Sequence, residues 1–321
     1  MNKTDNPMQG FRELSLSTFF DQYRCNEVYR KYVELLGIRV SDIQEISDIP
    51  FLPIKYFKTH KILCSEQKAQ IIFKSSGTSG QEQSQHFVSD LDVYRESYIK
   101  GFEYFYGNSV NYRFLALLPD YLEREGSSLV FMMDDLIRRS QYADSDFYLR
   151  NLDALLDVLI RNEKDKIPTI LFGVSYALLD LAEVITKPIR ELIIMETGGM
   201  KGKRPEIPKP AFHQILKKAF GVKEIHSEYG MTELLSQAYS QGDGKFRTPP
   251  WMKVIIRDLY DPFRPMPAGR TGGINVIDLA NKNSVSFIET QDLGRINSDG
   301  TFEVLGRINQ SDIRGCNLLL Q

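Results

Sequence analysis

The sequence contains little cysteine, and this shortage narrows the class of protein. Cys25, Cys64 and Cys316 are the three cysteines among 321 residues. They are too few and too scattered for a disulfide framework, and the absence of a CxxC pair argues against a cysteine-rich zinc site. We therefore expect Cys25 and Cys64 to be small, buried, apolar residues.

Long apolar runs and blocks of one charge are also lacking. No stretch approaches the roughly 18 to 20 apolar residues that a membrane span requires. The N-terminus is polar and has no apolar core of the kind found in signal peptides. The formal net charge is −2, with lysines and arginines scattered among acids, so no nucleic-acid partner is predicted. We expect a cytoplasmic protein without a membrane span.

What the sequence does contain is an alternation of short apolar runs and amphipathic segments. Aromatic and aliphatic residues at helical spacing predict helices, and compact β-branched runs predict strands. Helices are expected over 14–36, 151–160, 176–185 and 210–220, and strands over 69–73, 113–119, 169–174, 191–195 and 223–227. This order predicts an α/β fold with a largely parallel sheet flanked by helices.

The pattern changes near residue 240. Short strands are expected over 254–257, 273–279, 285–289 and 301–305, separated by turns rich in Pro, Gly, Asn and Asp, with no helix between them. This pattern of short strands and turns predicts a small β-rich subdomain. The predicted organisation is an α/β core over 1–240, a β-rich subdomain over 241–305 and a tail over 306–321 that contains Cys316.

A hydroxyl- and glycine-rich loop directly follows the first predicted strand of the core. Glycines allow backbone N–H groups to surround an anion, and hydroxyls add donors to phosphate oxygens. No Gly-Lys-Ser/Thr follows, so this is not a Walker loop; the alternative is an ordinary surface loop. The candidate phosphate-binding residues are Ser75, Ser76, Gly77, Thr78, Ser79 and Gly80.

A second candidate motif follows the predicted strand 223–227. Tyr229 is suited to stacking on a purine, and Gly230 permits close approach of the backbone. Thr232 can donate to a phosphate, and Glu233 offers the oxygen ligand that Mg²⁺ prefers. The alternative is a strand-to-helix turn with Thr232 or Glu233 near the start of a helix.

A third candidate lies in the β-rich part. Asp292, within the sequence TQDLGR, can accept both hydroxyls of a ribose, and Gly306-Arg307 follows it. The alternative for Asp292 is a solvated acid in a β-turn.

Together and in this order, the three motifs resemble those of the adenylate-forming superfamily. A fourth segment, Thr197 followed by Gly198 and Gly199, resembles the glycine pair on which adenine lies in that superfamily. The resemblance implies ATP and Mg²⁺ as cofactors, Asp292 on the ribose, Arg307 at the start of a hinge and Glu233 as the metal ligand. Thr232 and Glu233 would be catalytic.

Within that superfamily the chain looks most like the acyl-protein synthetase family, the LuxE-like fatty-acid-activating enzymes of bacterial luminescence operons. The similarity is carried by 49–53 (IPFLP), 57–59 (FKT), 75–80, 197–203 (TGGMKGK) and 314–316 (RGC). It implies an AMP-forming ligase that makes an acyl-adenylate and holds the acyl group as a thioester. Cys316 stands where the acceptor cysteine would be; a structural thiol is the alternative.

Several residues depart from the superfamily pattern. No lysine occurs in 81–84 (QEQS), and Asn309-Gln310 replaces the usual Asp-Asp of the hinge. Lys201, Lys203 or Arg204 could supply the missing charge. The chain ends at Gln321, so the resemblance implies that the C-terminal domain with its catalytic lysine is missing.

The acid and the acceptor stay open. The predicted substrate is a small carboxylic acid, with an acyl-carrier or acyl-reductase protein as a further partner. The alternatives are an acyl- or aryl-CoA ligase, and a nucleotide- or acyl-binding protein with impaired catalysis. Among the histidines, His86 is expected to be exposed in a loop, with contact to a phosphate as the alternative. His226 either lines the pocket or belongs to the core.

Overall fold

The computed structural model describes residues 7–76, 82–119, 126–189, 192–200, 203–205 and 207–308. The chain divides into two compact units, which we describe separately. Unit 1 comprises Met1–Tyr94, Thr232–Ser236 and Thr248–Gln321, and unit 2 comprises Arg95–Met231 and Gln237–Arg247. The domain boundaries predicted near residues 240 and 305 were drawn from the change in sequence pattern along the chain, and they remain predictions.

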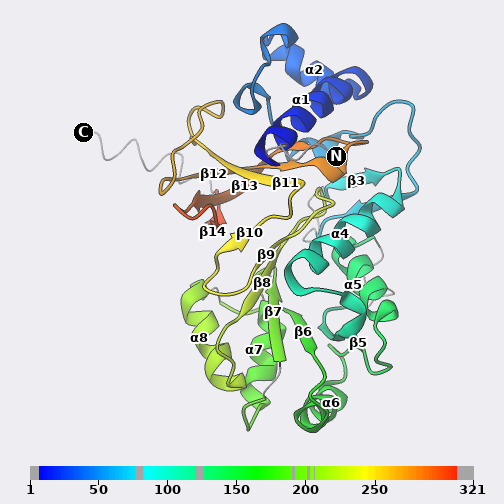
Figure 1. The fold of residues 1–321 in the computed structure, drawn as a ribbon, viewed down its shortest axis with the longest axis vertical. Helices are drawn as coiled ribbons and strands as arrows, with labels where there is room; N and C mark the ends of the chain where they lie inside the picture. The colour runs from blue at the N-terminus through cyan, green and yellow to red at the C-terminus, as the bar shows by residue number, and fades with distance from the viewer. Residues whose placement is uncertain are drawn as a thin grey trace. The chain divides into compact units, whose positions relative to one another are not determined.

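Unit 2 is built on a mixed sheet in which β6, β7 and β8 run side by side (Figure 1). The strands from β5 to β8 are parallel, and β9 and β10 add antiparallel pairs at the β8 edge. Their order is β10 (Phe246–Arg247), β9 (Ala238–Ser240), β8 (His226–Tyr229), β7 (Leu192–Thr197), β6 (Thr169–Val174), β4 (Arg113–Leu117) and β5 (Asp146–Phe147).

The sequence of these strands explains their position. Every residue of β4 and β6 is buried, as expected for parallel strands covered on both faces. The strand predicted over 169–174 matches β6, and those predicted near β4, β7 and β8 differ from the structure by a few residues at their ends. The predicted α/β fold with a largely parallel sheet is confirmed.

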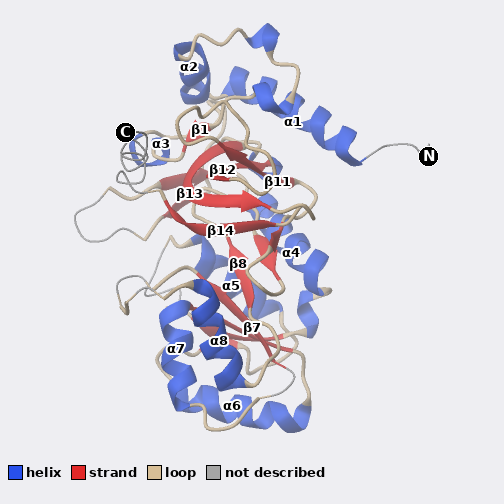
Figure 2. Ribbon diagram, turned by 90° about the vertical axis from the view of Figure 1, so that its left-hand side faces the viewer, coloured by secondary structure: helices blue, strands red, loops and turns tan. Residues whose placement is uncertain are grey.

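Helices flank this sheet. Ser127 and Asn151 cap the starts of α5 and α6 by accepting hydrogen bonds from the amides of Val130 and Ala154. Helix α7 packs on β6, β7 and α8 (Figure 2). The helices are α4 (Leu91–Tyr106), η3 (Ser109–Asn111), α5 (Ser128–Arg139), α6 (Leu152–Asp165), α7 (Ser175–Val184) and α8 (Lys209–Phe220). Residues 91–94 of α4 belong to unit 1, and the rest of the helix belongs to unit 2.

Unit 1 contains the predicted β-rich part. Its main sheet is antiparallel in the order β11 (Met252–Arg257), β12 (Thr271–Asp278), β13 (Phe287–Ile296) and β14 (Phe302–Arg307), with β1 (Leu52–Pro53) parallel to β13. A separate hairpin pairs β2 (Ile71–Lys74) with β3 (Gln85–Val88). The remaining elements are α1 (Pro7–Cys25), α2 (Glu27–Leu35), η1 (Val40–Asp42), η2 (Ile46–Asp48), α3 (Tyr56–Thr59) and η4 (Leu279–Asn281).

The single helix expected over 14–36 is in fact two helices. The break falls at Asn26, whose side-chain oxygen accepts from the amide of Tyr29 and caps α2. Its side-chain nitrogen donates to the carbonyl of Ser284 at 3.0 Å. Helical periodicity continues across the break, so the prediction from periodicity overlooked the N-cap signal of Asn26. None of the helices in the described ranges is long and apolar enough to cross a membrane.

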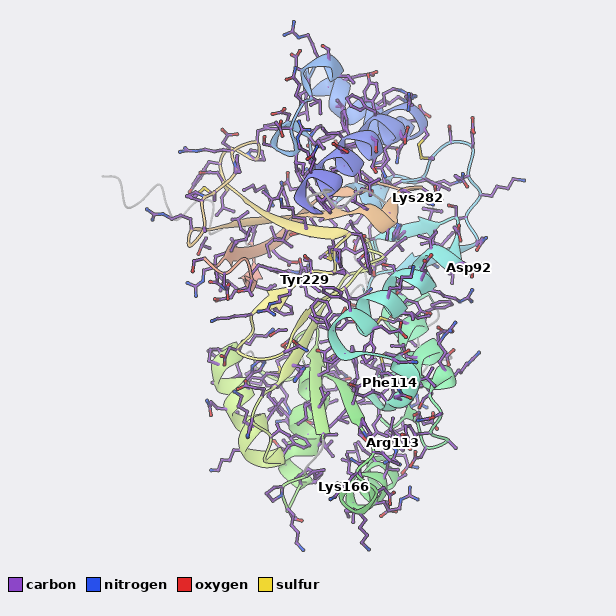
Figure 3. All side chains as sticks on the ribbon, in the orientation of Figure 1. Asp92, Arg113, Phe114, Lys166, Tyr229 and Lys282 are labelled. Atoms are coloured by element: carbon purple, nitrogen blue, oxygen red, sulfur yellow. A yellow bond between two sulfur atoms is a disulfide. The ribbon has the colours of Figure 1, made fainter. Side chains whose placement is uncertain are left out.

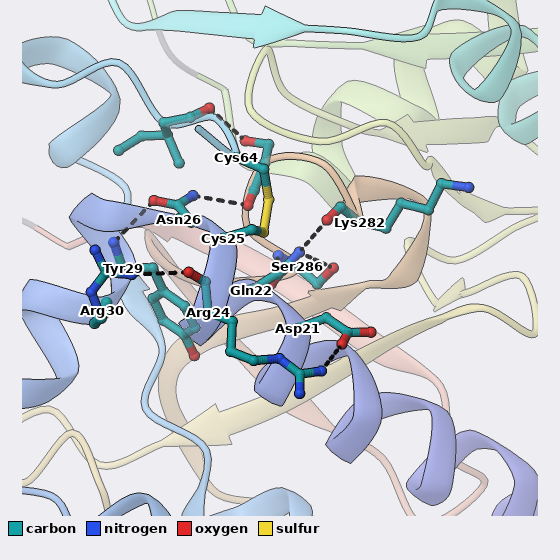
Figure 4. The surroundings of a disulfide bond; sticks show 12 residues. Asp21, Gln22, Arg24, Cys25, Asn26, Tyr29, Arg30, Cys64, Lys282 and Ser286 are labelled. Carbon is teal, nitrogen blue, oxygen red and sulfur yellow. Dashed lines mark hydrogen bonds and ion pairs between the residues drawn. A yellow bond between two sulfur atoms is a disulfide. The ribbon is translucent and has the colours of Figure 1, made fainter. Parts of the chain in front are cut away.

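Cys25 and Cys64 form a disulfide (Figure 4), so the expectation that they are unpaired apolar residues is wrong. The bond joins the end of α1 to the segment that leads to β2, with the Cα atoms 4.7 Å apart. The amide of Ser65 donates to the carbonyl of Cys25 at 2.8 Å. The two cysteines are separated by 39 positions, and nothing local in the sequence indicates that they meet.

Candidate functional site

In unit 2 the candidate residues gather where two neighbouring parallel strands end. Glu196 of β7 is opposite Ser227 of β8. Gly198 and Gly199, which follow β7, therefore lie at the same sheet edge as the last residue of β8. That last residue is Tyr229, which is labelled in Figure 3. Ligands of open α/β sheets bind at this carboxyl edge. The structure therefore brings the predicted adenine-binding residues of the two segments to one edge.

Two glycines lie at this edge, one favoured by its backbone conformation and the other by the close approach of a side chain. Gly198 has φ +67°, a left-handed conformation that glycine adopts without strain. Its carbonyl accepts from the hydroxyl of Ser175 at 3.2 Å. At Gly230 a Cβ atom would lie 2.4 Å from a carboxylate oxygen of Glu228. Any larger residue at 230 would displace that carboxylate, which accepts a hydrogen bond from Thr197.

A buried carboxylate that the sequence analysis missed lies beneath the edge. Glu196 accepts from the hydroxyl of Ser227 and from Nζ of Lys209, each at 2.7 Å, and Nε2 of His213 is 3.6 Å away. Burial alone would raise the pKa of the Glu196 carboxyl, but its partners His213, Lys209 and Ser227 lower it to about 2. Its signal in the sequence was an acidic residue at the end of an otherwise apolar strand.

In unit 1 the candidate site is centred on Glu233. Thr232 and Glu233 lie in a turn after β8, and the next element is strand β9, so the alternative of a strand-to-helix turn is wrong. Glu233 is 5% exposed. Burial raises the pKa of its carboxyl, a hydrogen bond with Ser84 and the charge of Arg307 oppose that rise, and the charge of Asp292 adds to it.

Asp292 and Arg307 are opposite each other on β13 and β14. Nε of Arg307 lies 3.4 Å from Oδ1 of Asp292. The side chain of Asp292 is 12% exposed and that of Arg307 is 77% exposed, so the pair has one buried and one accessible member. The charges of both residues also act on the carboxyl of Glu233, so the three predicted site residues lie within electrostatic range of one another in unit 1.

The start of the hydroxyl-rich loop is connected to the same group. Ser75 and Ser76 follow β2, and Oγ of Ser75 accepts from the amide of Ser84 at 2.9 Å. Ser84 in turn bonds the carboxylate of Glu233. The predictions for Gly77, Thr78, Ser79 and Gly80, and for Cys316 and Lys201, lie outside the described residues.

The expectation that His86 is exposed in a loop is wrong. His86 is in strand β3, opposite Phe73 of β2, and is fully buried. Its Nδ1 lies 2.8 Å from the carbonyl oxygen of Thr232, and burial lowers its pKa to about 4. His226, for which two interpretations were open, bonds the hydroxyl of Tyr106 at 3.1 Å at the start of β8. It is a hydrogen-bonded histidine of the sheet, and burial lowers its pKa to about 4.

The site fits a magnesium ion through one protein carboxylate. Within the described ranges, no group of three or more His, Cys, Asp or Glu side chains could hold a metal. Mg²⁺ commonly binds one or two carboxylates and completes its shell with substrate phosphates and water. Glu233, buried beside the hydroxyl of Ser84, offers an oxygen ligand of this kind.

The fold is that of adenylate-forming enzymes. A 2-hydroxyisobutyryl-CoA ligase solved with 2-HIB-AMP and CoA matches 94% of this chain and 70% of its own, with a TM-score of 0.68 and 12% identity. ATP-bound MatB from Rhodopseudomonas palustris matches 74% of this chain at a TM-score of 0.56 and 19% identity. The AMP complex of MenE from Bacillus subtilis matches 75% at 0.53 and 20%. The matched part spans about half of the MatB and MenE chains, 47% and 49% respectively.

The chain belongs to the family described as "Acyl-protein synthetase, LuxE", whose model matches residues 4–104 and 108–321. A long-chain-fatty-acid--luciferin-component ligase from Vibrio harveyi is 24% identical over 335 residues, which cover 92% of this chain and 83% of the relative. The resemblance inferred from the motifs, and the predicted ligase class, are therefore confirmed.

Proposed function

We propose that the chain uses ATP to activate a long-chain fatty acid as an acyl-adenylate and then transfers the acyl group to a thiol. The observation that carries this proposal is the ion pair of Asp292 and Arg307, whose charges both act on the buried carboxyl of Glu233. These residues come from separate motifs that match the order found in adenylate-forming enzymes. Membership of the acyl-protein synthetase family and the ligase relative from Vibrio harveyi support the choice of acid.

The chemistry requires positioning and charge compensation more than covalent participation by the protein. A carboxylate oxygen of the acid attacks the α-phosphorus of ATP, and the bond to pyrophosphate breaks. A thiolate then attacks the acyl carbon, AMP leaves, and the thiol proton passes to solvent. Mg²⁺, when bound, compensates the charge of the phosphates.

The residues are assigned separate parts in these steps. We propose that Gly198, Gly199 and Tyr229 hold adenine, that Asp292 accepts the ribose hydroxyls and that Glu233 holds Mg²⁺. Thr232 and the loop from Ser75 to Gly80 would donate to phosphate oxygens. Arg307 is exposed beside Asp292, so it is available to pair with an anionic group of the nucleotide.

An acyl- or aryl-CoA ligase is the second candidate. It is favoured by the match to the 2-hydroxyisobutyryl-CoA ligase over 94% of this chain. In that case coenzyme A would accept the acyl group in place of Cys316. A third candidate, a binding protein without catalysis, requires that nucleotide binds and no acid reacts.

Substrate-dependent exchange of pyrophosphate into ATP tests the proposal. Purified protein is incubated with ATP, Mg²⁺, labelled pyrophosphate and one acid from a panel that runs from acetate to C16, with benzoate included. We expect exchange that increases with chain length. An absence of exchange with every acid, while ATP still binds, would leave only the binding protein. Free acyl-CoA formed without labelled protein would identify the CoA ligase.

The partner and the cellular location are also proposals. We propose that an acyl-reductase or acyl-carrier protein takes the acyl group and that the protein works in the cytoplasm. The Cys25–Cys64 disulfide bears on this location, because disulfides are rare in reducing compartments. Alkylation of thiols immediately on cell lysis, followed by mass spectrometry, shows whether this pair is reduced in cells.

A further inference from the structure

Two buried side chains hold the main-chain carbonyls of the second motif. Nδ1 of His86 lies 2.8 Å from the carbonyl oxygen of Thr232. The side-chain nitrogen of Asn281 donates to the carbonyl of Glu233, also at 2.8 Å. His86 belongs to β3 and Asn281 to η4, and all four residues belong to unit 1. Two elements remote in sequence therefore fix two successive peptide groups of the turn.

The amides that follow are held from a third element. The carboxylate of Asp278, at the end of β12, accepts from the amides of Leu235 and Ser236 at 2.8 and 2.9 Å. It also accepts from the hydroxyl of Ser236 at 2.6 Å. Nε1 of Trp251 donates to that same hydroxyl at 3.0 Å. From Thr232 to Ser236 the segment thus has side-chain partners at both ends.

The protonation of His86 is determined by its surroundings. A carbonyl oxygen only accepts hydrogen bonds, so Nδ1 of His86 carries the proton that it donates to Thr232. Burial lowers the pKa of His86 to about 4, although the hydrogen bond with Thr232 and the side chain of Asn281 oppose that decrease, so the ring is neutral at pH 7. Its ring is edge-on to Phe57 with the ring centres 5.5 Å apart. A neutral, packed imidazole can direct a single donor without adding charge beside Glu233.

We propose that His86 and Asn281 are positioning residues that set the backbone of Thr232 and Glu233, and through it the carboxylate of Glu233. The inference rests on the proposed function, in which Glu233 holds Mg²⁺ against the phosphates of ATP. A displacement of about 1 Å in a positioned group is enough to reduce the rate of a reaction about 100-fold. Neither residue needs to touch the nucleotide for this effect.

Three substitutions and one matched control test the proposal in the exchange assay. His86→Phe keeps a ring and removes the donor, His86→Asn keeps a side-chain N–H donor near the position of Nδ1, and Asn281→Ala removes the second donor. The control is Asn162→Ala, which removes a fully buried asparagine of unit 2 whose side-chain oxygen accepts from Arg113 and Thr169. Thermal unfolding of each variant accompanies the kinetics.

We expect His86→Phe and Asn281→Ala to lower kcat by about tenfold or more and to raise the Mg²⁺ concentration that gives half-maximal exchange. The KM for the acid should change less than twofold, and His86→Asn should recover part of the loss. Asn162→Ala should lower the unfolding temperature and leave the Mg²⁺ requirement unchanged. Variants of His86 and Asn281 with a normal kcat and a normal Mg²⁺ requirement would overturn the proposal.

A double-mutant cycle separates positioning from a general loss of structure. If His86 acts through Glu233, His86→Phe should cost little additional activity in a Glu233→Gln background. Effects that multiply independently would show that His86 acts elsewhere, and would overturn the proposal while leaving the proposed function intact.

The positioning proposal can also be tested if the wild-type protein shows no pyrophosphate exchange with any acid. That result would contradict the proposed function but not the positioning roles. Trp251 is the single tryptophan of the chain, and its bond to Ser236 makes its emission a probe of the segment. We then expect His86→Phe to alter Trp251 emission and to reduce the amide protection of Leu235 and Ser236 in hydrogen exchange. Unchanged emission and protection would count against any positioning role.

Discussion

At the scale of single residues, burial and the available partners together determine the pKa of each carboxyl group. Glu196 and Glu233 are both buried carboxylates, but their pKa values shift in opposite directions. Glu196 has Lys209, Ser227 and His213 as partners. Glu233 has the hydroxyl of Ser84 and the more distant charges of Arg307 and Asp292, which oppose each other. An incompletely compensated carboxylate of this kind is suited to an incoming cation.

We therefore predict that Glu233→Gln lowers the rate of pyrophosphate exchange by about 100-fold or more, because an amide cannot replace an anionic ligand at the metal. Thermal stability should be unchanged or increased, since the substitution removes a carboxylate whose pKa is raised by burial. Glu289→Gln is the matched control, because Glu289 is a second carboxylate of unit 1 whose pKa is raised by burial. Equal losses of exchange in the two variants would contradict the role of Glu233.

His226 predicts a dependence of stability on pH. Its pKa is about 6.5 in the unfolded chain and about 4 in the folded protein. Between these values the unfolded state binds more protons, so the free energy of unfolding decreases as the pH falls from about 6.5 to 4. The full shift corresponds to roughly 3 kcal/mol, and partial solvent access to the ring reduces the expected contribution to about 1–2 kcal/mol.

The measurement is urea unfolding of the wild type and of His226→Asn, which keeps an acceptor for the hydroxyl of Tyr106, at steps between pH 7 and pH 4. His86 contributes to the slope of both proteins, so the difference between them isolates His226. Parallel curves across this window would show that His226 does not titrate as described.

At the scale of elements, unit 1 is held together by contacts between segments far apart in the chain. Gln22 of α1 donates to the carbonyl of Asn281 at 2.9 Å, and Asn26 donates to that of Ser284. The Cys25–Cys64 disulfide closes this region covalently. The N-terminal helices are thus bound to the β-rich part, and they hold the segment that contains Asn281.

We predict that the disulfide contributes about 2–4 kcal/mol to the free energy of unfolding, because it closes a loop with a sequence separation of 39 residues. Wild-type protein should lose this increment on addition of a thiol reductant. Cys25→Ser and Cys64→Ser should unfold at the same urea concentration with and without the reductant. A wild-type midpoint that is insensitive to the reductant would show that the bond is absent or does not stabilise the fold.

At the scale of the whole molecule, the chain passes four times between the two compact units, after residues 94, 231, 236 and 247. The second and third crossings isolate Thr232–Ser236 as a short segment of unit 1 between strands of unit 2. The predicted adenine residue Tyr229 and the predicted metal ligand Glu233 are four positions apart and belong to different units. The second motif, from Tyr229 to Glu233, is continuous in sequence and contributes residues to both units.

The fate of the acyl group is a prediction about the complete reaction. With labelled fatty acid and ATP, we expect wild-type protein to acquire hydroxylamine-labile label. Cys316→Ala should lose the label and retain pyrophosphate exchange, because exchange precedes transfer to the thiol. Cys64→Ala is the control and should remain labelled. Label that persists in Cys316→Ala would place the acceptor on another residue.

The sequence by itself determined the fold class, the family and the order of the motifs. Apolar runs such as 169–174 predict buried parallel strands, because a strand covered on both faces is apolar along its whole length. The glycines at 198 and 230 were recognisable from the motifs that contain them, because glycine permits a close approach of the backbone to a ligand. These features depend on residues that are close together in the sequence, so the sequence pattern predicts them.

The tertiary structure alone decided which distant residues meet. The disulfide, the burial of His86 and the partners of Glu196 depend on contacts across tens to hundreds of positions. Burial follows from the packing of the whole unit, and it is burial that gives His86 and Glu233 their shifted pKa values. No local pattern encodes these contacts, because each depends on where a remote strand or helix lies.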